Sequence, residues 1–135
     1  MIVVDTNIIG YLYLTSEYST QVEEVLLKDP EWVAPLLWRS EFRSVLALYI
    51  RKQILRFEDA VQIMDNAISL MRGGEYEVAS LEVLRLIKES RCSAYDCEFV
   101  ALALDLGIPL ITRDKQILEE FPQYAISPEK FLQQD

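Results

Sequence analysis

Four acidic residues of this chain stand in apolar surroundings, whereas most of its other Asp and Glu residues lie in polar ones. Asp5 follows Ile-Val-Val, Glu41 lies in an apolar segment, Asp96 lies within Ser-Ala-Tyr-Asp-Cys-Glu-Phe-Val-Ala, and Asp114 follows Pro-Leu-Ile-Thr-Arg. Acidic side chains are usually solvated, so acids in such contexts are candidates for a specific role. If the four carboxylates converge, their mutual repulsion calls for a neutralising cation.

An oxygen-only ligand set suits hard Mg²⁺ or Mn²⁺ and disfavours zinc or copper. Such an ion polarises a phosphodiester, generates hydroxide from bound water and stabilises the leaving oxygen. The chain has no histidine, which excludes every mechanism that uses imidazole as base, acid or ligand. Cys92 and Cys97 match no zinc-binding spacing and are expected to be buried thiols. The candidate chemistry is therefore metal-assisted hydrolysis without a protein nucleophile.

Three of the four acids have a structural alternative, because each falls where a helix is expected to begin. Asp5 and Asp114 are placed to act as helix N-caps, and Ser93 with Asp96 matches the S-x-x-D capping pattern. Taken singly, each of these acids is better explained as a cap, since caps are far commoner than metal ligands. Only the complete set favours a metal site.

Glu41 is harder to explain as a structural residue. At helical spacing it shares a stripe with Leu37, Val45 and Leu48, which is expected to be buried. A buried carboxylate without a partner costs several kcal/mol, so it is normally paired or bound to a metal. The structural alternative is an ion pair with one of the basic residues further along the chain, which are Arg85, Lys88 and Arg91.

Hydrophobic periodicity and turn signals predict strands that alternate with helices. The expected strands are 2–4, 32–34, 75–80, 109–112 and 124–126. The expected helices span 20–28, 36–52, 57–71, 81–89 and 93–106. One more helix is expected to end at residue 14, and another to begin at residue 115. This alternation implies an α/β protein with three layers, a central parallel sheet flanked by helices. Ligands of such sheets collect beyond the carboxyl ends of the strands, where Asp5 and Asp114 are expected.

Length and charge set broader limits. The 135 residues are expected to form a single domain, 1–135, with a substantial core. A net charge of −9 argues against broad nonspecific attraction to nucleic acid, although a local basic surface or a bound cation can still hold a phosphate. No basic leader and no apolar run of membrane-spanning length is present, so a cytoplasmic location is expected.

Basic residues gather around Glu41 in the sequence. Arg39, Arg43, Arg51, Lys52 and Arg56 lie in one segment, and Arg113 precedes Asp114. Arg39, Arg43 and Arg113 are therefore candidate phosphate contacts, with an ordinary solvated helix face as the alternative. The Tyr and Trp residues are expected in the core and not stacked on RNA bases.

The ordered motifs resemble the PIN-domain nucleases, and within them the VapC-type toxins, over nearly the whole chain. The resemblance rests on Val-Val-Asp5-Thr6-Asn7, Arg39-Ser40-Glu41-Phe42, Ser93-Ala94-Tyr95-Asp96-Cys97 and Pro109-Leu110-Ile111-Thr112-Arg113-Asp114. It implies a Rossmann-like fold and endonucleolytic cleavage of RNA with Mg²⁺ or Mn²⁺ bound by Asp5, Glu41, Asp96 and Asp114. Asn7 and Thr112 correspond to supporting polar residues. It further implies a homodimer neutralised by a small antitoxin protein.

Two alternatives within this resemblance stay open, a free-standing RNA-processing nuclease and a noncatalytic RNA- or protein-binding module. A third, a phosphotransferase of the haloacid-dehalogenase type, also begins with a strand followed by Asp but uses a D-x-D motif. Asn7 occupies the position of the second acid here, which removes the general acid and base of that mechanism.

Overall fold

A computed structural model of residues 1–135 contains one five-stranded sheet in the order β3-β2-β1-β4-β5, with every neighbouring pair parallel. The strands are β1 (Ile2–Val4), β2 (Trp32–Pro35), β3 (Glu75–Tyr76), β4 (Leu110–Ile111) and β5 (Ala125–Ile126). Val3 lies opposite both Val33 and Leu110, so β1 is the centre of the sheet. Its three residues are buried, as the apolar run Ile-Val-Val predicts for a strand covered on both faces.

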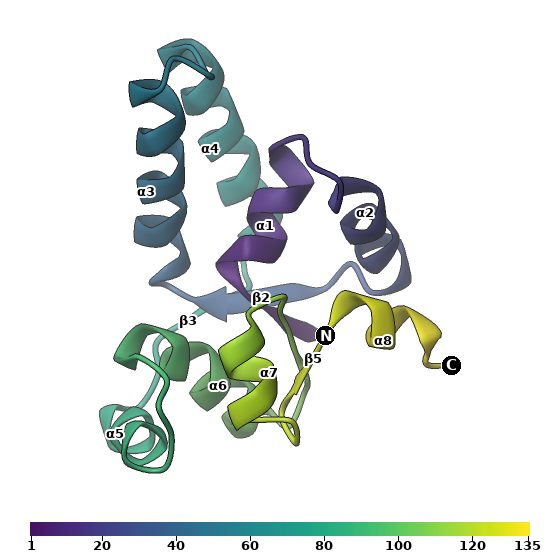
Figure 1. Cartoon of the computed structure of the whole chain (residues 1–135), viewed down its shortest axis with the longest axis vertical. Helices are drawn as coiled ribbons and strands as arrows, with labels where there is room; N and C mark the ends of the chain where they lie inside the picture. Colours follow the sequence, from purple (N-terminus) through teal and green to yellow (C-terminus); the bar gives the residue numbers. More distant parts are fainter.

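Helices cover both faces of the sheet, with α1 to α4 on one side and α5 to α7 on the other (Figure 1). They are α1 (Thr6–Tyr13), α2 (Ser19–Lys28), α3 (Trp38–Arg51), α4 (Phe57–Met71), α5 (Ser80–Lys88), α6 (Ala94–Leu106), α7 (Lys115–Glu120) and α8 (Pro128–Gln133). The expected α/β class and three-layer arrangement are confirmed. None of these helices is both long and apolar enough to cross a bilayer.

Helix α6 is the buried element of the second face and packs against β1, β2 and β4. Its buried residues are Cys97, Phe99, Val100, Ala101, Leu102 and Ala103. The helix ends at Gly107, which adopts the left-handed conformation, as the sequence predicts. Cys97 and the nearby Cys92 are buried free thiols, in agreement with expectation. Because α6 begins beside the carboxyl ends of the strands, its first turn is held at the same edge as the ends of β1 and β4.

The strand order creates a switch point at the centre of the sheet. The chain passes from β1 to β2 and β3 on one side, then returns through α5 and α6 to place β4 on the other side of β1. The connections leaving β1 and β4 therefore diverge, which opens a space beyond their carboxyl ends. Asp5 directly follows β1, and Thr112 directly follows β4.

Two elements differ from the sequence expectation. The strand expected over 75–80 is limited to Glu75–Tyr76, the two residues that pair with β2. Helix α8 was not expected, because a six-residue helix has little stability of its own. Tertiary contacts hold it in place, since Phe131 is buried and Lys28 of α2 donates hydrogen bonds to the carbonyl oxygens of Phe131 and Gln134.

The start of α2 also differs from expectation. The helix expected over 20–28 begins at Ser19, and its N-cap residue, Tyr18, makes no side-chain capping bond. The Ser19 hydroxyl instead donates to the carbonyl oxygen of Tyr11 at 2.7 Å. This contact ties α2 to α1, and it replaces a local capping interaction with a tertiary one.

Gly74 allows β2 and β3 to approach each other, and this generates a stability prediction. A Cβ at position 74 would lie 2.3 Å from the Trp32 carbonyl oxygen, a backbone atom that cannot rotate away. We expect Gly74→Ala to lower the free energy of unfolding by about 3 kcal/mol, measured by urea denaturation. Gly107→Ala is the control, because its Cβ would meet open space and only the positive φ is unfavourable, by about 1 kcal/mol. Equal losses in the two variants would contradict the steric explanation.

Candidate active site

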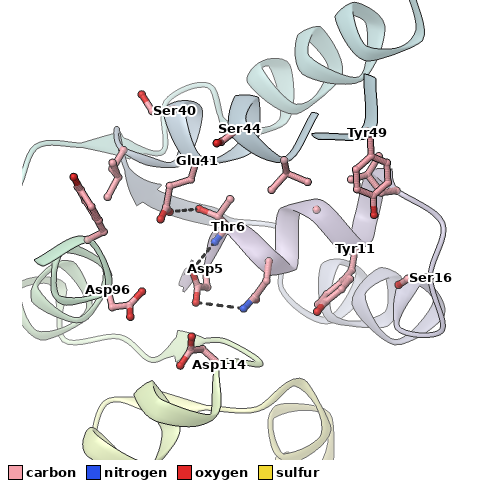
Figure 2. A pocket seen from close by; sticks show the side chains of 16 residues that line it. Asp5, Thr6, Tyr11, Ser16, Ser40, Glu41, Ser44, Tyr49, Asp96 and Asp114 are labelled. Atoms are coloured by element: carbon pink, nitrogen blue, oxygen red, sulfur yellow. Dashed lines mark hydrogen bonds between the residues drawn. The ribbon is translucent and has the colours of Figure 1, made fainter. Parts of the chain in front are cut away.

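A cavity of about 800 Å³ opens at the carboxyl edge of the sheet, between α1, α3 and the first turn of α6. The side chains of Asp5, Glu41, Asp96 and Asp114 all line it, and Figure 2 shows them gathered at one end. They come from four different elements, namely the ends of β1 and β4 and the first turns of α3 and α6. The carboxylates are separated, and the structure contains no group of three or more Asp, Glu or Cys side chains already arranged to hold a metal ion.

Asp5 is the most buried of the four acids, with 7 % of its surface exposed. It is the N-cap of α1, and its Oδ1 accepts the Thr6 backbone N–H at 2.7 Å. Its Oδ2 accepts the Thr112 hydroxyl at 2.6 Å and the Asn7 side-chain amide at 3.4 Å. Burial raises the pKa of Asp5 to about 7, against the lowering effect of these hydrogen bonds. The capping role expected as an alternative is therefore real, but it uses only one carboxylate oxygen.

Glu41 lies on the α3 wall of the cavity, with its Oε1 accepting the Thr6 hydroxyl at 2.7 Å (Figure 2). Partial burial raises its pKa, the Thr6 hydrogen bond opposes this, and the nearby Asp96 raises it again. The expectation that its helix stripe is buried is wrong in part, because Glu41 is only half-buried and Leu48 is exposed. The reason is that Leu37, Glu41 and Val45 line the open cavity.

Asp96 and Asp114 face each other across the cavity mouth, on α6 and at the start of α7. Ser93 caps α6 by accepting the Asp96 backbone N–H at 3.1 Å, as the S-x-x-D pattern predicts. Asp114 caps α7 by accepting the Ile117 backbone N–H at 2.9 Å. Burial raises the pKa of Asp96, and the negative charge of Asp114 adds to this effect. The two charges are therefore close enough to repel each other.

Thr112 connects two of these acids. Its hydroxyl donates to Asp5, while its oxygen accepts the Asp114 backbone N–H at 3.0 Å. The residue is fully buried, so this two-way contact is shielded from water. The side chain thus holds the ends of β1 and β4 in a fixed relation. Thr6 connects Asp5 and Glu41 in the same way, because its backbone N–H donates to Asp5 and its hydroxyl donates to Glu41. This role was not predicted from the sequence. The available signal was its position directly after Asp5, at the start of a helix.

No basic side chain neutralises the four acids. None of them forms an ion pair, and no Lys or Arg lines the cavity. The ion-pair alternative for Glu41 is wrong, because Arg85 pairs with Glu82 and Arg91 pairs with Glu120. Lys88 forms no ion pair either. The cavity is consequently a concentration of uncompensated negative charge.

Two of the three candidate phosphate contacts are occupied elsewhere. Arg39 donates two hydrogen bonds to Glu75 on β3, at 2.6 and 2.7 Å, beside the bond from Trp38 to the same carboxylate. Arg113 is mostly buried and donates to Glu129 at 2.6 Å. These residues fasten α3 to β3 and α8 to the β4–α7 turn, and neither lines the cavity. Arg43 is exposed, and its Nε donates to the carbonyl oxygen of Arg39.

The donor set at this end of the cavity fits a hard divalent cation. Asp5, Glu41, Asp96 and Asp114 all offer carboxylate oxygens to it, and the buried Oδ1 of Asn7 has no hydrogen-bond partner. Repulsion among unpaired carboxylates is relieved most effectively by a cation with oxygen preference.

The core position expected for the Trp and Tyr residues is confirmed for the buried Trp32 and Trp38 and is wrong for the exposed Tyr95. The other end of the cavity is aromatic, because two tyrosines that pack against the core also face it. Tyr11 of α1 and Tyr49 of α3 line it, and Tyr95 lies at the opposite end near Asp96. The spacing of these residues was a signal for this position. Tyr11 lies one helical turn after Asn7, and Tyr49 one turn after Val45, so each shares a helix face with a residue that lines the cavity.

The chain is similar to known proteins over most of its length. The sequence model of the PIN domain matches residues 2–123. Ribonuclease VapC3 of Pyrobaculum aerophilum is 27% identical over 124 residues, which cover 90% of this chain and 95% of that protein.

Solved structures share the fold over nearly the full length of both chains. PAE2754 from Pyrobaculum aerophilum has a TM-score of 0.77 at 21% identity, covering 97% of this chain and 92% of its own. FitAcB from Neisseria gonorrhoeae has a TM-score of 0.76 at 16% identity, covering 96% and 99%. A toxin–antitoxin complex from Klebsiella pneumoniae has a TM-score of 0.69 at 17% identity, covering 95% and 98%. With a family match that begins at β1 and extends past α7, this chain belongs to the PIN-domain family.

Proposed function

We propose that this protein is a Mg²⁺- or Mn²⁺-dependent endoribonuclease and the toxin of a VapBC-type toxin–antitoxin pair. The observation that carries the proposal is the set of four carboxylates without basic partners around one cavity of a PIN domain. RNA as the substrate is supported by the ribonuclease that the chain resembles over 90% of its length. The partner is supported by the fold shared with a chain of a toxin–antitoxin complex.

In this proposal Asp5, Glu41, Asp96 and Asp114 hold the divalent cation. When bound, such a cation polarises the phosphodiester and lowers the pKa of a water molecule that attacks it. The chain's own contribution is to position the carboxylates before the substrate arrives. The Thr112 hydroxyl fixes the rotation of Asp5, and the Thr6 hydroxyl fixes that of Glu41. Asn7 supports Asp5 through its side-chain amide.

The acid cluster also determines how RNA is held. A polyanion is repelled by uncompensated carboxylates at the distances found in such a cavity. The protein therefore attracts RNA only when cations neutralise the cavity, because no Lys or Arg lines it. Arg43, which is exposed at the start of α3, remains the proposed phosphate contact from the protein. The small antitoxin and a homodimeric assembly complete the proposal.

The first prediction concerns cleavage itself. Purified protein is expected to cleave single-stranded RNA with Mg²⁺ or Mn²⁺ and to lose this activity with chelator. Asp5→Asn and Asp96→Asn should each reduce the cleavage rate by about a hundredfold or more, because each removes a charged ligand. Asp105→Asn is the matched control, since Asp105 is an exposed acid on the same helix as Asp96. Chelator-resistant cleavage, or full activity in both site variants, would contradict the proposal.

The second prediction concerns stability and pH without any substrate. The folded-state pKa of Asp5 is raised from 3.8 to about 7, so its protonated form stabilises the fold at low pH. This stabilisation is complete below about pH 4 and is lost as the pH rises through 7. In chelator the melting temperature should therefore fall between pH 5 and 8. Added Mg²⁺ should raise it more at pH 8 than at pH 5, because ionised Asp5 binds the cation.

Asp5→Asn provides the test of this assignment, because asparagine keeps the shape of the side chain and cannot ionise. In chelator, the variant should lose most of the fall in melting temperature between pH 5 and 8. It should also lose most of the rise in melting temperature that Mg²⁺ causes at pH 8, as measured by differential scanning fluorimetry. Asp105→Asn should behave as wild type. An Mg²⁺ effect that is the same at both pH values would argue against Asp5 as a ligand.

The third prediction concerns the toxin role. Expression of the chain alone in a bacterial host is expected to arrest growth, whereas expression of Asp96→Asn is not. A short open reading frame next to the gene should encode a protein that copurifies with the chain and restores growth. Normal growth with soluble, RNA-cleaving protein would favour a free-standing RNA-processing nuclease.

A further inference from the structure

The cavity is larger than a cation and a phosphate require. Its volume of about 800 Å³ is that of a site for an organic ligand, and the four carboxylates occupy only one end. The opposite end, which we call the tyrosine subsite, is lined by Tyr11, Leu14, Val45 and Tyr49. Figure 2 shows Tyr11 and Tyr49 on the far side of Thr6 from Asp96.

The two tyrosines are held by their surroundings. The Tyr11 ring makes an edge-to-face contact with Tyr18, with centroids 5.0 Å apart, and the Arg113 guanidinium lies 3.6 Å above the Tyr18 ring. The carbonyl oxygen of Tyr49 accepts backbone N–H groups from the turn that follows α3, which fixes the end of that helix. The Tyr11 ring cannot rotate into the cavity without losing its contact with Tyr18. The α1 wall of the subsite is therefore preorganised for a ligand.

The two rings belong to the same space. Tyr11 on α1 and Tyr49 on α3 line the same cavity from different walls. Burial raises the pKa of Tyr11, the positive charge of Arg113 opposes this, and Tyr49 adds a smaller increase. Both side chains are partly exposed, so their faces are available to a ligand that enters the cavity.

The chemistry of this end selects a flat, uncharged ring. The subsite contains no basic residue that would hold a phosphate and no acid that would hold a cation. It offers aromatic faces, aliphatic walls and hydroxyl groups, the combination that binds unstacked nucleobases in single-stranded RNA. A paired base cannot enter such a cavity, because its partner strand would have to enter with it.

Its distance from the acids matches one nucleotide. Tyr11 lies about 9 Å along the α1 axis from Asp5, and Tyr49 lies about 12 Å along α3 from Glu41. A nucleotide spans a similar length from its phosphate to the far edge of its base. A phosphate at the carboxylates therefore directs the attached base into the tyrosine subsite.

We propose that Tyr11 and Tyr49 bind one unpaired nucleobase of the nucleotide whose phosphate lies at the four carboxylates. The inference rests on the proposed ribonuclease function and deepens it, because it assigns the two tyrosines as specificity determinants of the site. The base stacks on the tyrosine faces, and their hydroxyls hydrogen-bond its edge.

The binding test uses the full chain with Mg²⁺ and carbon-13-labelled tyrosine rings, followed by NMR. The probes are the four ribonucleoside 5′-monophosphates, with ribose 5-phosphate as the probe that lacks a base. We expect the nucleotides to shift the Tyr11 and Tyr49 signals and ribose 5-phosphate to leave them unchanged. Tyr13, which lies on α1 outside the cavity, is the internal control. If no nucleotide shifts either ring, the proposal is overturned and a protein partner becomes the better occupant.

Variants separate stacking from folding. Tyr49→Leu should weaken nucleotide binding about tenfold, and Tyr49→Phe should stay within about twofold, because it keeps the stacking face. Tyr13→Leu is the matched control and should bind as wild type. Melting temperatures of these three variants and of Tyr11→Leu establish that each of the four is folded. Wild-type affinity in folded Tyr49→Leu and Tyr11→Leu would overturn the proposal.

A cleavage test addresses the same subsite in the substrate. Oligoribonucleotides with one abasic position next to the cleaved bond should have a KM raised about tenfold. Tyr49→Leu should raise the KM of the intact substrate and leave the KM of the abasic substrate unchanged. The two changes are then non-additive, as expected if Tyr49 contacts the missing base directly. Equal effects on both substrates would overturn the subsite while leaving the nuclease proposal intact. Base-dependent NMR shifts without any cleavage would support the subsite and refute the nuclease proposal.

Discussion

The hydrogen bond from the Thr112 hydroxyl to Asp5 is the contact on which the candidate site depends. It joins residues that are 107 positions apart and lies in the buried centre of the sheet edge, where β1 and β4 end together. The same threonine oxygen accepts the backbone N–H of Asp114. One hydroxyl therefore sets the rotation of a buried carboxylate and the path of the chain that carries another. A valine in its place would keep the shape of the strand end and leave both acids without this restraint.

The acids of the cavity have no basic partners because the nearby arginines form ion pairs with acids outside it. Arg39 pairs with Glu75, and Arg113 pairs with Glu129. Both arginines were expected to contact phosphate, but they connect the elements around the cavity instead. The acids that line the cavity receive hydroxyl and amide hydrogen bonds, which orient a carboxylate without cancelling its charge. The fold thus stabilises its periphery with ion pairs and leaves the centre uncompensated, an arrangement that is stable only if part of that charge is protonated or bound to a cation.

Sequence reasoning predicted those features that depend on local pattern. The apolar run before Asp5, the cap at Ser93 and the glycine after α6 each specify a short stretch of chain, and each is found where expected. Features that depend on distant segments were not predictable. Helix α8 exists because Lys28 and the buried Phe131 hold it, and Arg113 is turned from the cavity by Glu129 on that helix. The tyrosines were assigned to the core because their spacing is the same for a buried face and for a cavity wall.

The pairing of Val3 with Leu110 and of Val33 with Val3 means that β1 completes its place in the sheet only after β4 has been synthesised. Contacts between such distant segments carry a high loop-closure cost and form late in folding. The first strand can meet β2 early, but its other edge stays open until β4 arrives. A chain still being translated therefore contains Asp5, Glu41 and Asp96 without the strand that fixes Asp5. Folding order thus delays the assembly of the acidic site until β4 has been synthesised.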